Sequence, residues 1–209
     1  MKLNRFLGEF AGTAILLIAV VGSSYMAQNL TTDEAVALLI NALVTAAILA
    51  IIIKGFIGIS GSHFNPAVTI ALALKRKFNL RDVPGFLIAQ VSGGITGVII
   101  ANAMFTEALL ELSSKTRNGY QVLIGESIAT AGLLALALFA SKNLVWKLIP
   151  LWIFGAYFFT SSTSFANPAV TIARTFTTSP SGIAPESIFA FIVVQILTAC
   201  AIAVFVKEK

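Results

Sequence analysis

Few side chains in this sequence could take part in chemistry, and most of those that could lie inside long apolar runs. Glu9 and Glu126 are carboxyl groups within such runs, and as a pair they could serve acid–base catalysis. Cys200 is the only cysteine and His63 the only histidine, so neither an intrachain disulfide nor a cysteine-based metal cluster can form. Because no nucleophile or metal cluster accompanies the carboxyl groups, we expect no enzyme activity and no cofactor or metal.

A more specific signal is an Asn-Pro-Ala tripeptide that occurs twice. The tripeptides are Asn65, Pro66 and Ala67 in the first half of the chain and Asn167, Pro168 and Ala169 in the second. Each opens the heptapeptide Asn-Pro-Ala-Val-Thr-Ile-Ala, with an offset of 167 − 65 = 102 residues. Asparagine is a preferred N-cap and proline suits the first helical turn, so both copies predict the start of a short helix. The positive dipole ends would oppose a passing cation, and the asparagine amides could donate hydrogen bonds to a neutral solute.

The elements that must position these residues are membrane spans. Of the 209 residues, 57% are apolar and 11% charged, against about 25% charged in a soluble domain. Six apolar runs are long enough to cross a bilayer with some tilt. They cover Leu7–Met26, Val36–Ile53, Val83–Phe105, Val122–Phe139, Leu144–Ser161 and Ile188–Val206. Two shorter runs, Asn65–Leu74 and Asn167–Phe176, reach about halfway and must pack within protein or line a wet cavity.

The basic residues predict how the spans are oriented. Eleven of them fall on one side of the membrane: Lys2, Arg5, Lys54, Lys75, Arg76, Lys77, Arg81, Lys142, Lys147, Lys207 and Lys209. Only Lys115, Arg117 and Arg174 fall on the other, so both termini are expected in the cytoplasm. The formal charge of +5 then reflects membrane topology, and the expected partner is the bilayer and not a nucleic acid. Short loops without disulfides favour a prokaryotic plasma membrane.

Other residues recur in the two halves of the chain and, with the heptapeptide, predict a duplicated unit of three spans. Two pairs of polar residues recur at similar offsets, Glu9 with Glu126 and Gln90 with Gln195. Because three is odd, the second unit must enter the membrane from the opposite side. The sequence therefore predicts one channel domain, residues 1–209, built from inverted repeats 1–115 and 116–209, with the substrate path at the repeat interface.

These motifs resemble the paired signature of the major intrinsic protein family, the aquaporins and aquaglyceroporins. The resemblance rests on residues 61–69 (Gly-Ser-His-Phe-Asn-Pro-Ala-Val-Thr), on residues 165–169 (Phe-Ala-Asn-Pro-Ala) and on the six spans. It implies an all-α membrane channel of six transmembrane helices and two re-entrant half-helices, assembled as a homotetramer with one pore per subunit. It also implies that four side chains accept or donate hydrogen bonds to support the re-entrant loops: Glu9, Glu126, Gln90 and Gln195.

One departure from the family pattern concerns the narrowest part of the pore. The family usually has arginine directly after the second Asn-Pro-Ala, where this chain has Val170. By spacing, the selectivity filter falls on Thr45, Gly155, Ser164 and Val170, which carry neither a fixed charge nor an aromatic ring. We therefore expect a wide filter that passes neutral solutes larger than water, such as glycerol, urea or undissociated arsenite. Some bacterial relatives with valine at this position resemble metalloid channels.

The roles of two residues and the choice between functions stay open at this point. Arg174 lies four residues beyond Val170 and is interpreted either as a cation of the outer vestibule or as a snorkelling or surface-paired arginine. His63 is expected to pack in its loop or to line the pore rather than to act as a pH gate. The alternatives to a wide solute channel are a water-selective aquaporin and an ion-coupled secondary transporter. A transporter would need titratable residues at the bilayer midplane, where the asparagines are expected.

Overall fold

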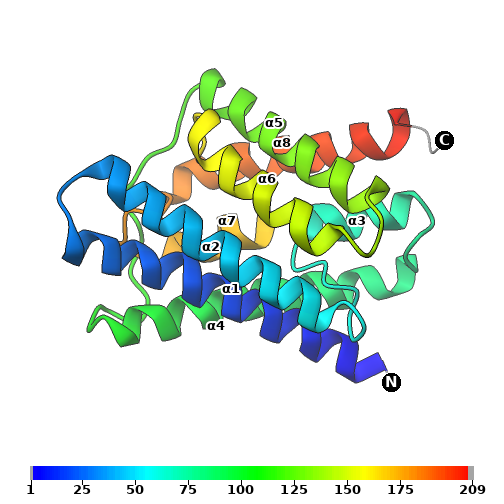
Figure 1. The fold of residues 1–209 in the computed structure, drawn as a ribbon, viewed down its shortest axis with the longest axis horizontal. Coiled ribbons are helices and arrows are strands. Elements are labelled where there is room, and N and C mark those ends of the chain that lie inside the picture. The colour runs from blue at the N-terminus through cyan, green and yellow to red at the C-terminus, as the bar shows by residue number, and fades with distance from the viewer. Residues whose placement is uncertain (1, 207–209) are drawn as a thin grey trace.

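The structure is a computed structural model that describes residues 2–206. Over that range the chain forms eight α-helices and two single-turn 3-10 helices, and no strand (Figure 1). The six longer helices are α1 (Lys2–Leu30), α2 (Glu34–Phe56), α4 (Val83–Met104), α5 (Tyr120–Phe139), α6 (Val145–Phe159) and α8 (Pro185–Phe205). The short ones are α3 (Pro66–Leu74) and α7 (Pro168–Ala173), with η1 (Leu80–Asp82) before α4 and η2 (Arg174–Phe176) after α7. The predicted all-α fold of six longer helices and two half-helices is confirmed.

One predicted span is shorter than expected. Five of the longer helices are long and apolar enough to cross a membrane, whereas α6 has only 15 residues, about 22 Å of helix. It replaces the predicted run Leu144–Ser161 and ends at Phe159, because Thr160 adopts an extended conformation (φ −110°, ψ 140°) and leads into the loop before α7. The helix is therefore shorter than the predicted run, while the predicted arrangement of six longer helices is kept.

Helices α1 and α4 pack with their backbones in close contact. A Cβ atom on Gly93 would lie 2.3 Å from the carbonyl oxygen of Phe10, and one on Gly97 would lie 2.3 Å from that of Ala14. Neither position has room for a side chain, and small residues at membrane helix interfaces allow such close approach. The contact fixes the depth of α1 in the bundle, and with it the position of Glu9.

The two half-helices meet inside the bundle. Figure 1 shows α3 on the side of the molecule where both described ends of the chain lie, and α7 on the other side. Each begins with proline in its first turn after an asparagine N-cap. The inverted arrangement therefore brings Asn65 and Asn167, both buried, together inside the bundle.

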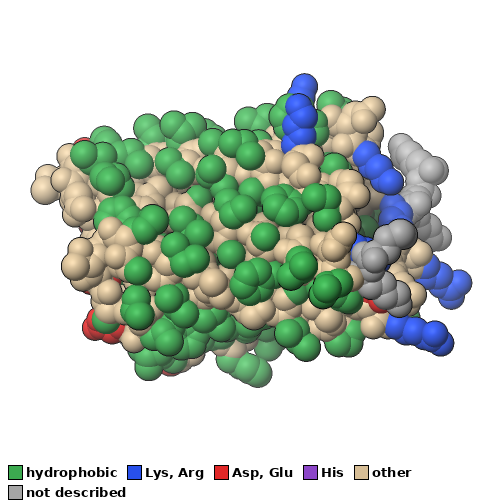
Figure 2. Space-filling model, turned by 90° about the horizontal axis from the view of Figure 1, so that it is seen from below, with side chains coloured by type: hydrophobic (Ala, Val, Ile, Leu, Met, Phe, Trp, Pro, Cys, Tyr) green, Lys and Arg blue, Asp and Glu red, His purple; other side chains and the backbone are tan. Residues whose placement is uncertain are grey.

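The outer surface of the bundle has the character of a lipid-facing surface. Figure 2 shows apolar side chains spread over its flank, while lysines and arginines gather at the end that holds the chain termini. Large apolar side chains such as Ile51, Ile88 and Phe189 are more than half exposed. A soluble protein rarely exposes so continuous an apolar surface, so these helices are suited to a bilayer.

Candidate functional site

The two loops that precede the half-helices adopt the same unusual backbone. Positive φ angles occur at Ser62 (55°) and Phe64 (48°) in the first loop and, 102 residues later, at Ser164 (53°) and Ala166 (48°) in the second. Residues other than glycine seldom adopt such angles, because the side chain then crowds the backbone. Strong anchors must therefore hold each loop in place, and in both loops a buried glutamate supplies them.

Glu9 of α1 is fully buried and anchors the first loop. Its carboxylate accepts hydrogen bonds from the backbone N–H groups of His63 (3.0 Å) and Phe64 (2.6 Å). Ser60 Oγ donates to it at 2.6 Å and Gln90 Nε2, from α4, at 2.7 Å. Loop N–H groups inside a membrane have no water to bind, so the carboxylate gives them the acceptors that helix geometry would otherwise supply.

Glu126 of α5 anchors the second loop in the same way. It accepts hydrogen bonds from the N–H groups of Phe165 (3.2 Å) and Ala166, and Gln195 Nε2 of α8 donates to it at 2.7 Å. Both carboxylates are thus occupied by loop donors. Each carboxylate binds its own loop, and the two are not arranged with each other as an acid–base pair.

The two asparagines cap their own helices and also bind the opposite loop. Asn65 Oδ1 accepts from Ala67 N at 2.8 Å, and Asn167 Oδ1 accepts from Ala169 N at 3.0 Å. The Nδ2 of Asn65 donates to the carbonyl oxygen of Ala166 (2.7 Å), and the Nδ2 of Asn167 donates to that of Phe64 (2.8 Å). Each amide nitrogen has two hydrogens, so one donor of each remains for a solute.

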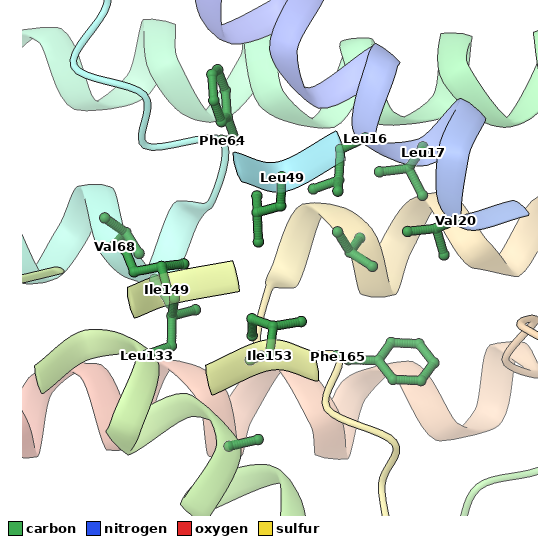
Figure 3. Packing of buried hydrophobic residues seen from close by; sticks show 14 of the residues in the cluster. Leu16, Leu17, Val20, Leu49, Phe64, Val68, Leu133, Ile149, Ile153 and Phe165 are labelled. Atoms are coloured by element: carbon green, nitrogen blue, oxygen red, sulfur yellow. The ribbon is translucent and has the colours of Figure 1, made fainter. Parts of the chain in front are cut away.

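A cavity of about 900 Å³ runs past both asparagines. Most of its wall is apolar, and Figure 3 shows the aliphatic side chains that form it, among them Leu16, Leu49, Ile149 and Ile153. The loops add a polar strip that includes the two asparagines and Ser164. Among the described residues that line the cavity, four are lysine or arginine and none is aspartate or glutamate: Arg5, Lys77, Lys142 and Arg174.

The structure brings three of the four predicted filter residues to this cavity, and Tyr157 takes the place of the fourth. Thr45, Ser164 and Val170 line it, but Gly155 does not. A Cβ on Gly155 would meet only the exposed ring of Phe159, whereas Tyr157 is buried and its hydroxyl lies 3.3 Å from Thr45 Oγ1.

Gly155 lies away from the face of α6 that lines the cavity, and helical periodicity is the reason. The cavity-lining residues of α6 are Val145, Ile149, Ile153 and Tyr157, four residues apart along one face. A shift of two residues turns a side chain by about 200°, to the opposite face of the helix. The i, i+4 spacing places these four residues on one face of α6, and the packing of α6 against the other helices decides that this face turns toward the cavity.

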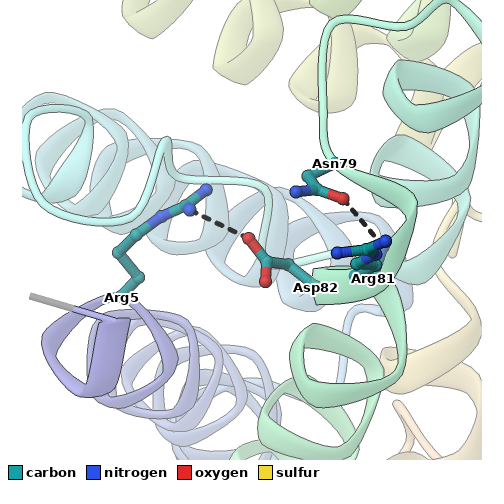
Figure 4. A network of polar contacts seen from close by, with 4 residues as sticks. All are labelled: Arg5, Asn79, Arg81 and Asp82. Carbon is teal, nitrogen blue, oxygen red and sulfur yellow. Dashed lines mark hydrogen bonds and ion pairs between the residues drawn. The ribbon is translucent and has the colours of Figure 1, made fainter.

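The end of the cavity near the chain termini is built around His63. Its Nδ1 lies 3.0 Å from Thr69 Oγ1, and its ring contacts those of Phe78 and Phe86. Arg5 lies over both phenylalanine rings. It also pairs with Asp82 at 3.3 Å, as Figure 4 shows. Phe78 also lines the cavity, and it could not be predicted alongside His63, since one phenylalanine among sixteen carries no distinguishing signal.

At the other end of the cavity lies Arg174, in the η2 turn directly after α7. Its backbone N–H donates to the carbonyl oxygen of Val170, one turn earlier. The side chain is only 2% exposed and lines the cavity, so it is not an arginine on the protein surface.

Comparisons with known proteins agree with this geometry. A sequence model described as "Major intrinsic protein" matches residues 1–162. The chain is 43% identical over 205 residues to aquaglyceroporin AqpS of Rhizobium meliloti (strain 1021), an alignment that covers 96% of this chain and 88% of that protein. Aquaporin NIP3-1 of Arabidopsis thaliana is 35% identical over 102 residues, covering 49% of this chain and 31% of its own.

Among solved structures, the X-ray structure of the aquaglyceroporin from Plasmodium falciparum has the same fold. It superposes with a TM-score of 0.70 at 20% sequence identity, over 98% of this chain and 97% of that one. The family match covers more than half of the chain, and the bacterial relative covers nearly all of it. The chain therefore belongs to the major intrinsic protein family, whose members are non-enzymatic membrane channels for water and small solutes.

Proposed function

We propose that this chain is a passive channel for neutral solutes larger than water, with glycerol, urea and undissociated arsenite as candidates. The observation that carries the proposal is the uncharged filter: Val170 follows the second Asn-Pro-Ala and lines the cavity beside Thr45 and Ser164. Val170 brings no charge to the position where the family usually has arginine. The name of the bacterial relative, an aquaglyceroporin, supports the same substrate class.

The two-sided lining of the cavity suits such solutes. A small polyol has carbon on one side and hydroxyl groups on the other, and the apolar wall and polar strip match these two sides. Ser164 Oγ is buried and has no hydrogen-bond partner within residues 2–206, so it is available to a solute hydroxyl. Together with the free amide hydrogens of Asn65 and Asn167, it forms the polar side of the proposed solute path.

A second candidate is a water-selective channel, and Tyr157 is the observation that favours it. Its hydroxyl contacts Thr45 across the cavity, so an aromatic ring lies at the filter, where spacing alone had put glycine. An aromatic side chain there narrows the path. The size of the largest solute that passes then depends on how far Tyr157 projects.

Stopped-flow light scattering on proteoliposomes distinguishes the two candidates. Water-driven shrinkage is compared with re-swelling in glycerol and urea and with arsenite uptake, for the natural chain and for Tyr157→Ala, Tyr157→Phe and Gly155→Ala. We expect the natural chain to pass glycerol, Tyr157→Ala to raise solute flux relative to water several-fold, and Gly155→Ala, the matched control, to change neither. Fast water flux with no solute entry in the natural chain would favour the water channel. Uptake that saturates or follows a proton gradient would indicate an ion-coupled transporter.

We further propose that residues 1–115 and 116–209 are the two inverted repeats and that four chains form a tetramer with one pore each. The matching φ angles and glutamate anchors of the two loops support the repeats. Chemical cross-linking of the purified protein in detergent tests the tetramer, which requires a four-chain band.

We also propose that both termini face the cytoplasm of a prokaryotic plasma membrane. Basic residues gather at the end of the molecule that holds the termini, which supports this orientation (Figure 2). Three of the basic residues from which this orientation was predicted have side chains outside the described part of the chain: Lys2, Lys207 and Lys209. Labelling a cysteine introduced at the exposed Lys142 with a membrane-impermeant thiol reagent tests it: intact cells should block labelling, and permeabilised cells should allow it.

A further inference from the structure

Arg174 is a buried cation that faces the cavity and has no ion pair. Within residues 2–206, no carboxylate lies within salt-bridge distance of its guanidinium. Buried charges in proteins are normally paired, because an unpaired one loses its hydration without compensation. The charge of Arg174 therefore faces the cavity without a carboxylate to neutralise it.

The guanidinium of Arg174 is held in a fixed position. It stacks over the ring of Phe165, 3.6 Å from the centroid, and its Nε donates to the carbonyl oxygen of Ser181. Phe165 is itself fixed, because its N–H binds Glu126 in the anchored loop. The cation therefore stays in the wall of the cavity while a solute passes.

A second arginine adds to the positive charge at this mouth. Arg117, in the loop before α5, lies over the same ring at 4.9 Å and donates to the carbonyl oxygens of Gly182 (3.0 Å) and Pro180 (3.3 Å). Burial lowers the pKa of Arg117 to about 10, so it remains charged at neutral pH. Two guanidinium groups therefore lie over the ring of Phe165, at the end of the cavity opposite the chain termini.

We propose that Arg174 adds to the half-helix dipoles a fixed charge that excludes cations and protons from this pore, one helical turn beyond the filter of Thr45, Tyr157, Ser164 and Val170. A fixed charge in a narrow, poorly hydrated passage repels an approaching cation far more strongly than in water, and it leaves a neutral solute unaffected. Moving this charge away from Val170 separates two tasks: the filter can stay uncharged and open to larger solutes, while exclusion of ions takes place further out. This inference rests on the proposed function and names the specificity-determining residue of the same pore.

The test measures ion leak and solute flux in the same proteoliposomes. Proton leak is read from an enclosed pH dye under a potassium diffusion potential, and glycerol flux from light scattering. Arg174→Ala should raise the proton leak by about tenfold or more while glycerol flux is kept or increased. Arg174→Lys keeps a charge and should leak less than Arg174→Ala. Arg81→Ala, an exposed arginine away from the cavity, is the matched control and should leave both fluxes unchanged.

Two further variants keep the test decisive if Arg174→Ala fails to fold, as judged by gel filtration. Arg174→Gln removes the charge at similar volume and should also leak. Phe165→Leu keeps the arginine but removes its stacking partner, and should give an intermediate leak. Leak at the natural level in every folded Arg174 variant without charge would overturn the inference. If the natural chain passes no glycerol, the proposed function is overturned instead. The inference on Arg174 can still be tested in that case, by measuring the proton leak of Arg174→Gln alongside its water flux.

Discussion

The loops before α3 and α7 share one backbone but carry different side chains at the same position. His63 in the first loop corresponds to Phe165 in the second, 102 residues later. His63 binds Thr69 and lies against two phenylalanine rings, whereas Phe165 supports two arginines. The two loops are thus alike where they are anchored and different where they face the two mouths of the cavity.

The difference follows from what surrounds each part. Backbone N–H groups inside the membrane have the same need for acceptors in both halves, so a glutamate with a glutamine partner serves each loop. The side chains at the mouths have no such common constraint. The two loops can therefore keep the same polar anchor while the two mouths of the cavity differ in charge and shape.

The anchors should give the largest effect when broken. Glu9→Ala leaves two loop N–H groups and Gln90 without their acceptor, and Glu126→Ala does the same to the second loop. We expect each to lower the free energy of unfolding by about 3 kcal/mol or more, since breaking one side of a buried polar network is strongly destabilising. Thermal unfolding in detergent, followed by gel filtration, measures it.

The matched controls are Glu9→Gln and Glu126→Gln. Each keeps one acceptor oxygen, so each should lose less unfolding free energy than the alanine variant. The comparison of the loops predicts similar losses for the two alanine variants. A chain that tolerates one of them and not the other would show that the loops are not anchored equivalently.

A smaller effect is expected from the close packing of α1 against α4. Gly97→Ala would place a Cβ 2.3 Å from the carbonyl oxygen of Ala14, so α1 and α4 must separate. We expect a cost of about 1–3 kcal/mol, typical of overpacking. Gly55→Ala is the control, because a Cβ there meets nothing within 4 Å. The melting temperature should fall for Gly97→Ala only, and an equal response of the two variants would contradict the packing argument.

The smallest effect should come from exchanging the ring that differs between the loops. His63→Phe makes the first loop resemble the second, keeps the contacts with Phe78 and Phe86, and loses the hydrogen bond to Thr69. A loss of about 0.5–1.5 kcal/mol in unfolding free energy is expected. Solute flux measured at pH 5 and pH 8 should keep the same ratio in the variant as in the natural chain. A change in that ratio would mean that His63 titrates as a gate.

Much of the candidate site could be predicted because its signals are local. An asparagine followed by proline marks a helix start wherever it occurs, and both half-helices begin where that pattern predicts. Tyr157 was missed because spacing along the sequence takes no account of which face of α6 turns toward the cavity. The contact of Phe165 with Arg174 and Arg117 joins three segments of the chain, and no spacing in the sequence predicts such a contact.

The sequence by itself determined the membrane class, the two half-helices and the family, because apolar run length and capping chemistry depend on neighbouring residues alone. Only the tertiary structure decided which face of α6 lines the cavity and that Arg174 is buried in its wall. These depend on how α6 packs against the other helices and on which distant segments close around the Arg174 side chain. Free energies of packing and hydrogen bonding between segments set both, and they have no counterpart in a local pattern of residues.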